Sequence, residues 1–219
     1  MTSTVVVLSG GMDSAVLLYH LNSLSHDLKA ISVNYGQRHA RELEAAAELC
    51  RRLDVEHRVV DLRSLAAILG KNSLSDVSVD VPEGHYQEES MKLTVVPNRN
   101  MLLLSVAIAW AVSLKYDHVA YGAHSGDHAI YPDCRPEFVD AMDRAAGLCD
   151  WHPLSILRPF VHLDKGDIAR RGDELGVPFD ITWTCYKGGQ RHCGKCGACQ
   201  ERREAFAKHS LPDPTDYEP

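Results

Sequence analysis

The chain has 219 residues, of which 45% are hydrophobic and 24% are charged. This length and composition predict one folded domain with a real core, or one domain with a small appendage, and argue against wholesale disorder. The formal net charge of -7 argues against stable nucleic-acid binding, which needs Lys and Arg to neutralise phosphates. No apolar run approaches the roughly 20 residues of a membrane span, and no basic segment precedes the first apolar run as in a signal peptide. We therefore expect a cytoplasmic protein without a membrane partner.

Apolar, strand-like runs alternate with helical segments along the chain. The run over residues 5–8 is β-branched and does not alternate with polar residues, which is typical of a strand buried on both faces. In chain order the elements are strand 5–8, helix 14–24, strand 29–34, helix 38–53, strand 56–62, helix 99–114, strand 118–121, helix 137–146, strand 156–158 and helix 164–176. This alternation predicts an α/β fold, a Rossmann-like parallel sheet with helices on both faces.

Ligands of such sheets bind beyond the carboxyl ends of the strands. The polar segments 9–14, 34–39 and 122–135 follow three of the expected strands, so we expect the site there. Residues 70–94 are mostly polar, and so long a loop inside a domain is usually a lid or a disordered segment. We divide the chain into an α/β domain over 1–180 and a C-terminal unit over 181–219.

The turn after the first strand reads "SGGMDS" over residues 9–14. Glycines let the backbone approach a phosphate closely, and the free N–H groups of the next helix point at it. Neither the Lys-containing phosphate loop nor Gly-x-Gly-x-x-Gly matches this turn. An ordinary strand-to-helix turn capped by Asp or Ser is the alternative that the residues leave open.

Four of the seven cysteines form the series Cys185-x7-Cys193-x2-Cys196-x2-Cys199. Four thiolates complete a closed tetrahedral zinc shell, so the spacing favours a structural zinc knuckle followed by a short helix over 200–209. A [4Fe–4S] cluster is the competing interpretation. We expect His192 to be a neighbour rather than a ligand, and the arginines of the short helix, Arg202 and Arg203, to be solvated.

Beyond these patterns, "SGGMDS" resembles the signature of the N-type ATP pyrophosphatases. The stretches "VNYGQRHARELEAA", "VPNRNMLLLSVA" and "YPDCRPEFVDA", with "TCYKGG" and "HCGKCGACQERREAF" near the end, resemble the 7-cyano-7-deazaguanine synthase family, QueC, of queuosine biosynthesis. The resemblance is nearly full-length and its motifs keep their order. Two departures stand out: Asn98 where many members have glycine, and "HSGDHAIYPDCR" where many read "ETDFSGYPDCR".

The resemblance implies an ATP-dependent ligase that converts 7-carboxy-7-deazaguanine and ammonia into the nitrile through an adenylated carboxylate and an amide. It implies ATP, Mg²⁺ and Zn²⁺ as cofactors and a homodimer as the assembly. The four cysteines of the series would bind zinc. The expected ATP-binding residues are Leu8, Ser9, Gly10, Gly11, Met12, Asp13, Ser14, Ala15, Val16, Leu17, Leu18 and Arg38.

The chemistry also needs cations beside the phosphates and a carboxylate to read the edge of a guanine-like base. The catalytic candidates are Asp13, Arg99, Arg135 and Lys165. The substrate-binding candidates are Tyr35, Gln37, Arg99, Asp127, Tyr131, Asp133 and Arg135. Simpler interpretations stay open: Arg38 begins a solvated helix, Asp133 pairs with Arg135, and Asp127 is a loop residue or joins His124 and His128 in a second metal site.

Three rival functions follow from the same residues. A tRNA-modifying ATP pyrophosphatase needs a basic RNA-binding surface, which the acidic composition disfavours. A zinc-knuckle binding module does not need a complete α/β core. A QueC-like enzyme that transfers an activated deazaguanine to another acceptor shares the activation chemistry, and the altered segment 124–130 keeps that alternative open.

Overall fold

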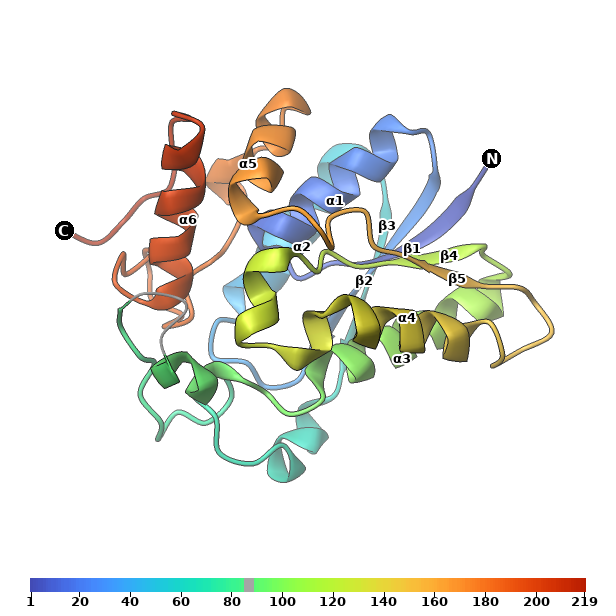
Figure 1. The fold of residues 1–219 in the computed structure, drawn as a ribbon, viewed down its shortest axis with the longest axis horizontal. Helices are drawn as coiled ribbons and strands as arrows, with labels where there is room; N and C mark the ends of the chain where they lie inside the picture. The colour runs from blue at the N-terminus through green and yellow to red at the C-terminus, as the bar shows by residue number, and fades with distance from the viewer. Residues whose placement is uncertain (85–88) are drawn as a thin grey trace.

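The computed structural model describes residues 1–84 and 89–219, and these form a five-stranded, fully parallel sheet (Figure 1). The strand order is β3-β2-β1-β4-β5, so the chain winds outward from β1 in both directions. The strands are β1 (Ser3–Val7), β2 (Asp27–Asn34), β3 (Glu56–Asp61), β4 (His118–Ala120) and β5 (Ser155–Leu157). The predicted Rossmann-like α/β fold is confirmed.

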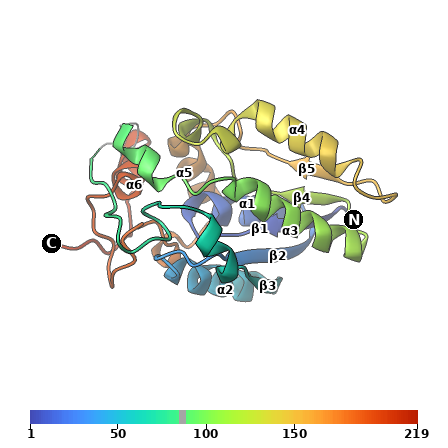
Figure 2. The same ribbon diagram turned by 90° about the horizontal axis from the view of Figure 1, so that it is seen from below.

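Helices cover both faces of the sheet, as predicted (Figure 2). On one face lie α1 (Met12–Ser23) and α2 (Arg41–Leu53), with α5 (Lys165–Glu174) against α1 and α6 (Gly197–Lys208) against α5. The other face carries α3 (Arg99–Leu114) and α4 (Pro136–Ala146). Short 3₁₀ helices complete the described elements: η1 (Arg63–Ile68), η2 (Glu89–Thr94), η3 (Ser125–Ala129), η4 (Pro132–Cys134) and η5 (Phe179–Ile181).

The central strands are buried on both faces because successive side chains point to opposite sides. Val5 of β1 belongs to the core under α3 and α4, whereas its neighbour Val6 belongs to the core under α1 and α5. Val119 and Ala120 of β4 divide between the same two cores. This two-sided burial explains the unalternating apolar runs of the sequence.

The described part of segment 70–94 packs against the rest of the protein. Leu74 and Met91 are buried, and the Arg38 guanidinium donates to the carbonyls of Asp76 and Val79 at 2.9 and 3.0 Å. The predicted helix over 38–53 consequently begins later, at Arg41, because the preceding residues form a turn that holds this segment. Residues 85–88 of the proposed lid lie outside the described residues, so the lid hypothesis stays a prediction.

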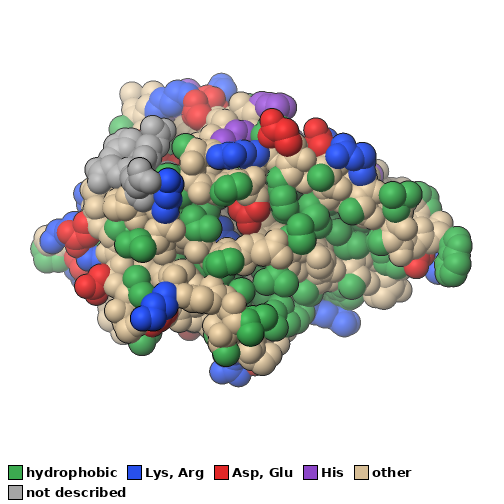
Figure 3. Space-filling model, turned by 60° about the horizontal axis from the view of Figure 1, so that its bottom comes forward, with side chains coloured by type: hydrophobic (Ala, Val, Ile, Leu, Met, Phe, Trp, Pro, Cys, Tyr) green, Lys and Arg blue, Asp and Glu red, His purple; other side chains and the backbone are tan. Residues whose placement is uncertain are grey.

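One apolar stretch is longer than expected from the sequence. The stretch Ser90–Leu114 is long and apolar enough to cross a membrane by length and composition alone. Its main part, α3, packs on β1, β2 and β4 and buries Leu104 and Ala111 in the core. Core packing of a helix against a parallel sheet therefore accounts for its apolar composition. Figure 3 shows hydrophobic side chains gathered along one exposed face; Met101 of α3 is among the exposed large hydrophobic residues.

Of the two arginines of α6, Arg203 is exposed as predicted, but Arg202 is not. Arg202 is completely buried: it donates to the Phe179 carbonyl at 2.9 Å and the Thr182 hydroxyl at 2.7 Å, and it pairs with Asp213 at 3.2 Å. The Arg203 guanidinium lies 3.9 Å from the centre of the Tyr217 ring. These contacts attach α6 both to the segment before the cysteines and to the C-terminal segment.

Candidate active site

A cavity of about 200 Å³ lies beyond the carboxyl ends of β1, β2 and β4. This is the point where the strand order reverses, and helices leave the sheet toward opposite faces there. Its walls come from the turn after β1, from Tyr35 after β2, from the segment 121–134 and from the segment around Cys185. Three of the predicted polar segments therefore meet here, as the topology rule led us to expect.

The turn over residues 9–14 forms the cavity wall at the N-terminus of α1. The Ser9 and Ser14 hydroxyls lie 3.0 Å apart, and Ser9 Oγ accepts a hydrogen bond from the Gly11 N–H at 3.2 Å. No side chain caps the first turn of α1 among the described residues. Backbone N–H groups at such a helix end suit an anion, because they add to the positive end of the helix dipole.

Position 10 requires glycine for a reason other than the approach of a phosphate. Its φ of +84° is a conformation that L side chains rarely adopt, and a Cβ there would lie 2.0 Å from the Glu42 carbonyl oxygen. Gly10 thus allows α2 to pack directly on the turn. Gly11, in contrast, lines the cavity.

A charged cluster lies beside the turn. Lys165 Nζ is 3.2 Å from Asp13 Oδ2 and 2.7 Å from Glu201 Oε2. His124 is almost fully buried, with Nε2 3.7 Å from Asp13 Oδ2 and 3.5 Å from Asp127 Oδ2. The cluster therefore holds Lys165 among three carboxylates on the cavity wall.

Burial and charge act in opposite directions on this cluster. Burial alone lowers the pKa of Lys165, but the combined attraction of Asp13, Glu201 and Asp127 raises it well above its ordinary value. Burial raises the pKa of Glu201, and the Lys165 charge opposes that rise. Lys165 is therefore protonated throughout the physiological range and presents a permanent positive charge to the cavity.

The expected ATP-binding residues separate into two groups. Leu8, Ser9, Met12 and Ser14 line the cavity together with Gly11 and Asp13. The next turn of α1 does not: its side chains are fully buried in the core on the α5 side of the sheet, at Ala15, Val16, Leu17 and Leu18. This turn lies farther along the helix from its N-terminal end at the cavity, and there α1 is buried on all sides.

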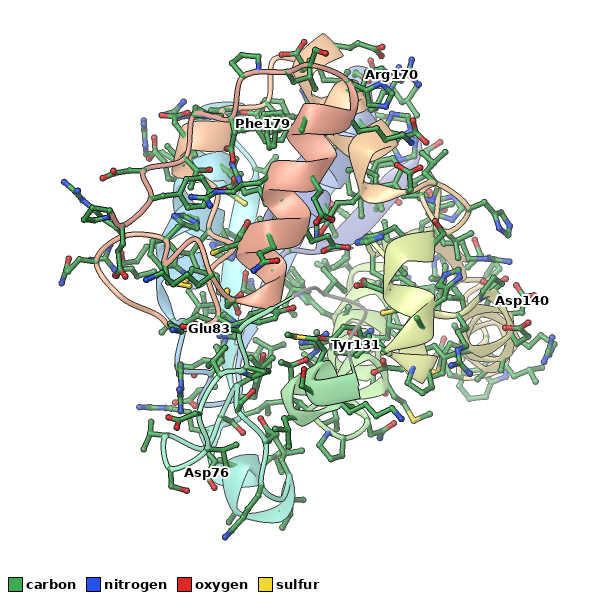
Figure 4. The ribbon with its side chains drawn as sticks, turned by 60° about the vertical axis from the view of Figure 1, so that its left-hand side comes forward. Asp76, Glu83, Tyr131, Asp140, Arg170 and Phe179 are labelled. Atoms are coloured by element: carbon green, nitrogen blue, oxygen red, sulfur yellow. The ribbon has the colours of Figure 1, made fainter. Side chains whose placement is uncertain are left out.

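Of the expected substrate residues, Tyr35, Arg99, Asp127 and Tyr131 line the cavity. The Tyr131 hydroxyl lies 2.5 Å from Thr94 Oγ1 and 3.5 Å from the Tyr186 hydroxyl. Figure 4 shows Tyr131 in the interior beneath α6, whereas Asp76, Asp140 and Arg170 lie at the periphery.

Besides Gly10 and residues 15–18 of α1, four candidates lie outside the cavity lining, each for a physical reason. Gln37 is buried and bonds to the Tyr35 N–H and to Glu42, so it shapes the turn after β2. Asp133 Oδ2 accepts from the Asn100 N–H at 3.0 Å and so caps the first turn of α3.

The other two are arginines. Arg135 is exposed, and its Nε donates to the His128 carbonyl at 2.8 Å. Arg38 is bound to segment 70–94 as described above, and its Nε is buried without a hydrogen-bond partner among the described residues. The structure does not bring either guanidinium to the cavity, so neither position supports the predicted contact with ATP or substrate.

Several residues of the site were not predicted. His39 and Glu42 approach the cavity from the start of α2, and Thr184 and Tyr186 approach it from either side of Cys185. Glu201 reaches Lys165 from α6, two residues after Cys199. One feature of the sequence could have indicated them: residues next to a cysteine of the series are fixed by the cluster and can form the wall of a nearby pocket.

The four cysteines of the series meet as predicted. All four are buried, and their Sγ atoms lie within 4.8 Å of one another. Backbone N–H groups of Cys193, Lys195 and Cys196 point at cluster sulfurs at 3.3–3.4 Å. Such bonds stabilise thiolates, so the cluster fits a closed Zn²⁺ shell. His192 is a neighbour, as expected: its Nε2 accepts from the Thr184 N–H at 3.0 Å.

Fold and site together define a Rossmann-like α/β protein with a ligand cavity at the carboxyl edge of its sheet and a four-cysteine cluster packed beside that cavity. Two solved structures are similar in fold. The first is an NMN synthetase from Francisella tularensis, with a TM-score of 0.55 and 19% sequence identity; the match covers 95% of this chain and 77% of that chain. The second is a predicted subunit of a tRNA methyltransferase from Methanocaldococcus jannaschii, with a TM-score of 0.53 and 15% identity; the match covers 100% of this chain and 93% of that chain.

Sequence comparison gives the family. Residues 3–210 match the family described as "Queuosine biosynthesis protein QueC". A 7-cyano-7-deazaguanine synthase of Pseudoalteromonas translucida is 53% identical over 100% of both chains. One of Methanoregula boonei is 52% identical over 98% of this chain and 99% of the relative. The chain belongs to the QueC family.

Proposed function

We propose that this protein is an ATP-dependent ligase that forms 7-cyano-7-deazaguanine from 7-carboxy-7-deazaguanine and ammonia. One observation supports this most directly: a single cavity joins an uncapped helix N-terminus, the Lys165 cluster and an arginine surrounded by tyrosines. The first two parts suit the phosphates of ATP, and the third suits a planar, acidic heterocycle. Relatives of the same length, about half identical, carry this activity as their name.

The reaction has to remove two oxygens from a carboxylate, which is a poor electrophile. A carboxylate oxygen attacks the α-phosphorus of ATP, and pyrophosphate leaves with the electron pair of the broken P–O bond. Ammonia then displaces AMP to give the amide and releases a proton. In the same way, the amide oxygen attacks the α-phosphorus of a second ATP and pyrophosphate leaves; loss of AMP and of both amide protons then gives the nitrile.

The side chains on the cavity wall fit the charges of this sequence. Negative charge develops on the phosphates in each activation step, and Lys165 is a fixed cation beside the turn. The Asp13 atom Oδ1 is buried without a hydrogen-bond partner among the described residues, which suits a cation ligand. Asp13 and Asp127 would therefore hold Mg²⁺, which when bound neutralises phosphate charge.

The proposal also includes three finer expectations from the sequence. These are Zn²⁺ on the four cysteines, a homodimer and a cytoplasmic location. Sedimentation velocity measures the assembly, and elemental analysis measures one zinc per chain.

The test uses the purified, zinc-loaded protein with ATP, Mg²⁺, ammonium and 7-carboxy-7-deazaguanine, followed by mass spectrometry of the base. We expect conversion to the nitrile, reduced at least about 100-fold in Asp13→Asn because a charged transition-state contact is lost. Asp173→Asn, an exposed substitution on α5, should convert at the wild-type rate. Accumulation of an adenylated base without nitrile would instead indicate transfer to another acceptor.

A further inference from the structure

Arg99 begins α3 and lines the cavity, surrounded by aromatic side chains. Its guanidinium carbon lies 5.6 Å from the centre of the Tyr131 ring, and its charge acts on the hydroxyls of Tyr35 and Tyr186. Val33 and Leu103 add apolar surface to the same wall. The cation therefore lies in a partly desolvated, mainly aromatic part of the cavity.

No carboxylate lies within ion-pair distance of Arg99 in the part of the chain that the structure describes. Lys165, the other lysine or arginine on the cavity wall, has both Asp13 and Glu201 within 3.2 Å. Arg99 also stands at the N-terminus of α3, where the helix dipole disfavours a positive charge. A desolvated charge at such a place is costly unless an anion joins it.

The tyrosines do not supply that negative charge. Burial raises the pKa of Tyr35 to about 12, and burial also raises the pKa of Tyr131 and of Tyr186. All three hydroxyls are therefore neutral at physiological pH, and hydroxyls of this kind can donate to an anion. Arg99 and its tyrosines keep a net charge of +1.

We infer that Arg99, together with the hydroxyls of Tyr35 and Tyr186 and the ring of Tyr131, forms the subsite for the carboxylate of the deazaguanine substrate; this inference rests on the proposed function. The planar guanidinium matches a carboxylate in a bidentate manner. The aromatic and apolar side chains around it suit the flat heterocycle that carries the carboxylate. Pairing with Arg99 also offsets the repulsion between the carboxylate and the phosphates of ATP.

A phosphate of ATP is the other anion that this cation could bind. Phosphate has its own donors in the uncapped turn of α1 and in Lys165, which is already held by Asp13 and Glu201, whereas the guanidinium of Arg99 lies over the Tyr131 ring. We therefore assign Arg99 to the substrate carboxylate and leave the phosphates to the turn.

Calorimetric titration of the zinc-loaded protein tests the assignment with three separate probes: 7-carboxy-7-deazaguanine, 7-cyano-7-deazaguanine and ATP with Mg²⁺. We expect the wild type to bind the carboxylate at least 10-fold more tightly than the neutral nitrile. Arg99→Met should reduce this preference to within about threefold and leave ATP affinity unchanged. Arg99→Lys should retain part of the preference, and the exposed Arg144→Met should retain all of it.

Thermal unfolding without ligand separates this role from a structural one. An uncompensated charge destabilises the free protein, so Arg99→Met should raise the midpoint of unfolding without ligand. The carboxylate ligand should raise the midpoint of the wild type but not that of Arg99→Met. A lower midpoint in Arg99→Met, or an undiminished preference for the carboxylate, would overturn the subsite. Loss of ATP affinity with the preference intact would assign Arg99 to phosphate. If the wild type neither binds nor converts the carboxylate, the proposed function itself fails.

Discussion

At the scale of residues, the main feature of the site is an ammonium group close to several carboxylates. Lys165 is held between Asp13 and Glu201, and these come from three different helices, α5, α1 and α6. The ammonium group is therefore fixed before any ligand arrives, and such preorganised charge stabilises developing negative charge most effectively. Arg99 differs because its partner has to come with the substrate.

Replacing Lys165 by methionine tests how much the fixed positive charge contributes to kcat. We expect kcat to fall about 100-fold or more, the range for loss of one preorganised electrostatic contact. Lys115→Met provides the matched control, because Lys115 is an exposed lysine at the opposite, amino edge of the sheet. Steady-state rates of nitrile formation measure both, and an unchanged kcat in Lys165→Met would exclude Lys165 from the activation steps.

At the scale of elements, close packing of α2 on the turn after β1 shapes the phosphate end of the cavity. Gly10 makes this possible, as the missing Cβ leaves space for the Glu42 carbonyl. The sequence predicted the glycine turn, either for phosphate approach or as an ordinary capped turn, but not the packing of α2 against it. Which helix packs on a turn depends on tertiary contacts that a local pattern does not contain.

Gly10→Ala and Gly176→Ala form a matched pair for this packing. Both glycines have positive φ, but a Cβ at position 176 meets nothing within 4 Å, whereas a Cβ at position 10 meets backbone at 2.0 Å. We expect about 1–2 kcal/mol of lost stability for the strained backbone in each, and roughly 1–3 kcal/mol more in Gly10→Ala for the overlap. Urea unfolding measures the difference; equal losses would show that α2 does not constrain the turn.

At the scale of the whole molecule, the four-cysteine cluster joins the C-terminal unit to the active site. Thr184 and Tyr186 flank Cys185 and line the cavity, and Glu201 follows Cys199 and contacts Lys165. Arg202, buried between α6 and the segment before the cysteines, reinforces the same connection. Metal binding should therefore organise the site although none of the four cysteines lines the cavity.

Cys199→Ser tests this connection against Cys149→Ser, since Cys149 is exposed and lies outside the cluster. We expect Cys199→Ser to lose most of its zinc, to unfold at a lower temperature and to form nitrile at least about 10-fold more slowly, the effect typical of disturbed ligand surroundings. Cys149→Ser should match the wild type in zinc content, midpoint and rate. Full activity in a zinc-free Cys199→Ser protein would separate the cluster from catalysis.

The strands, helices and the cysteine cluster could be predicted because each follows from local sequence: buried apolar runs, helical spacing and ligand spacing. The cavity as a whole could be placed from topology alone. Its individual members could not all be found, because Tyr186 and Glu201 reach it through long-range packing. The same packing removed Arg38 and Arg135, whose guanidinium groups bind backbone carbonyls elsewhere.

Isotope labelling shows whether the substrate carboxylate is activated by adenylylation in this cavity. The wild-type protein is given ATP, Mg²⁺, ammonium and 7-carboxy-7-deazaguanine labelled with ¹⁸O in both carboxylate oxygens, and the nucleotide products are weighed by mass spectrometry. We expect AMP that carries one ¹⁸O atom per molecule, formed together with the nitrile. Nitrile formation with unlabelled AMP, or with the label in inorganic phosphate, would contradict it.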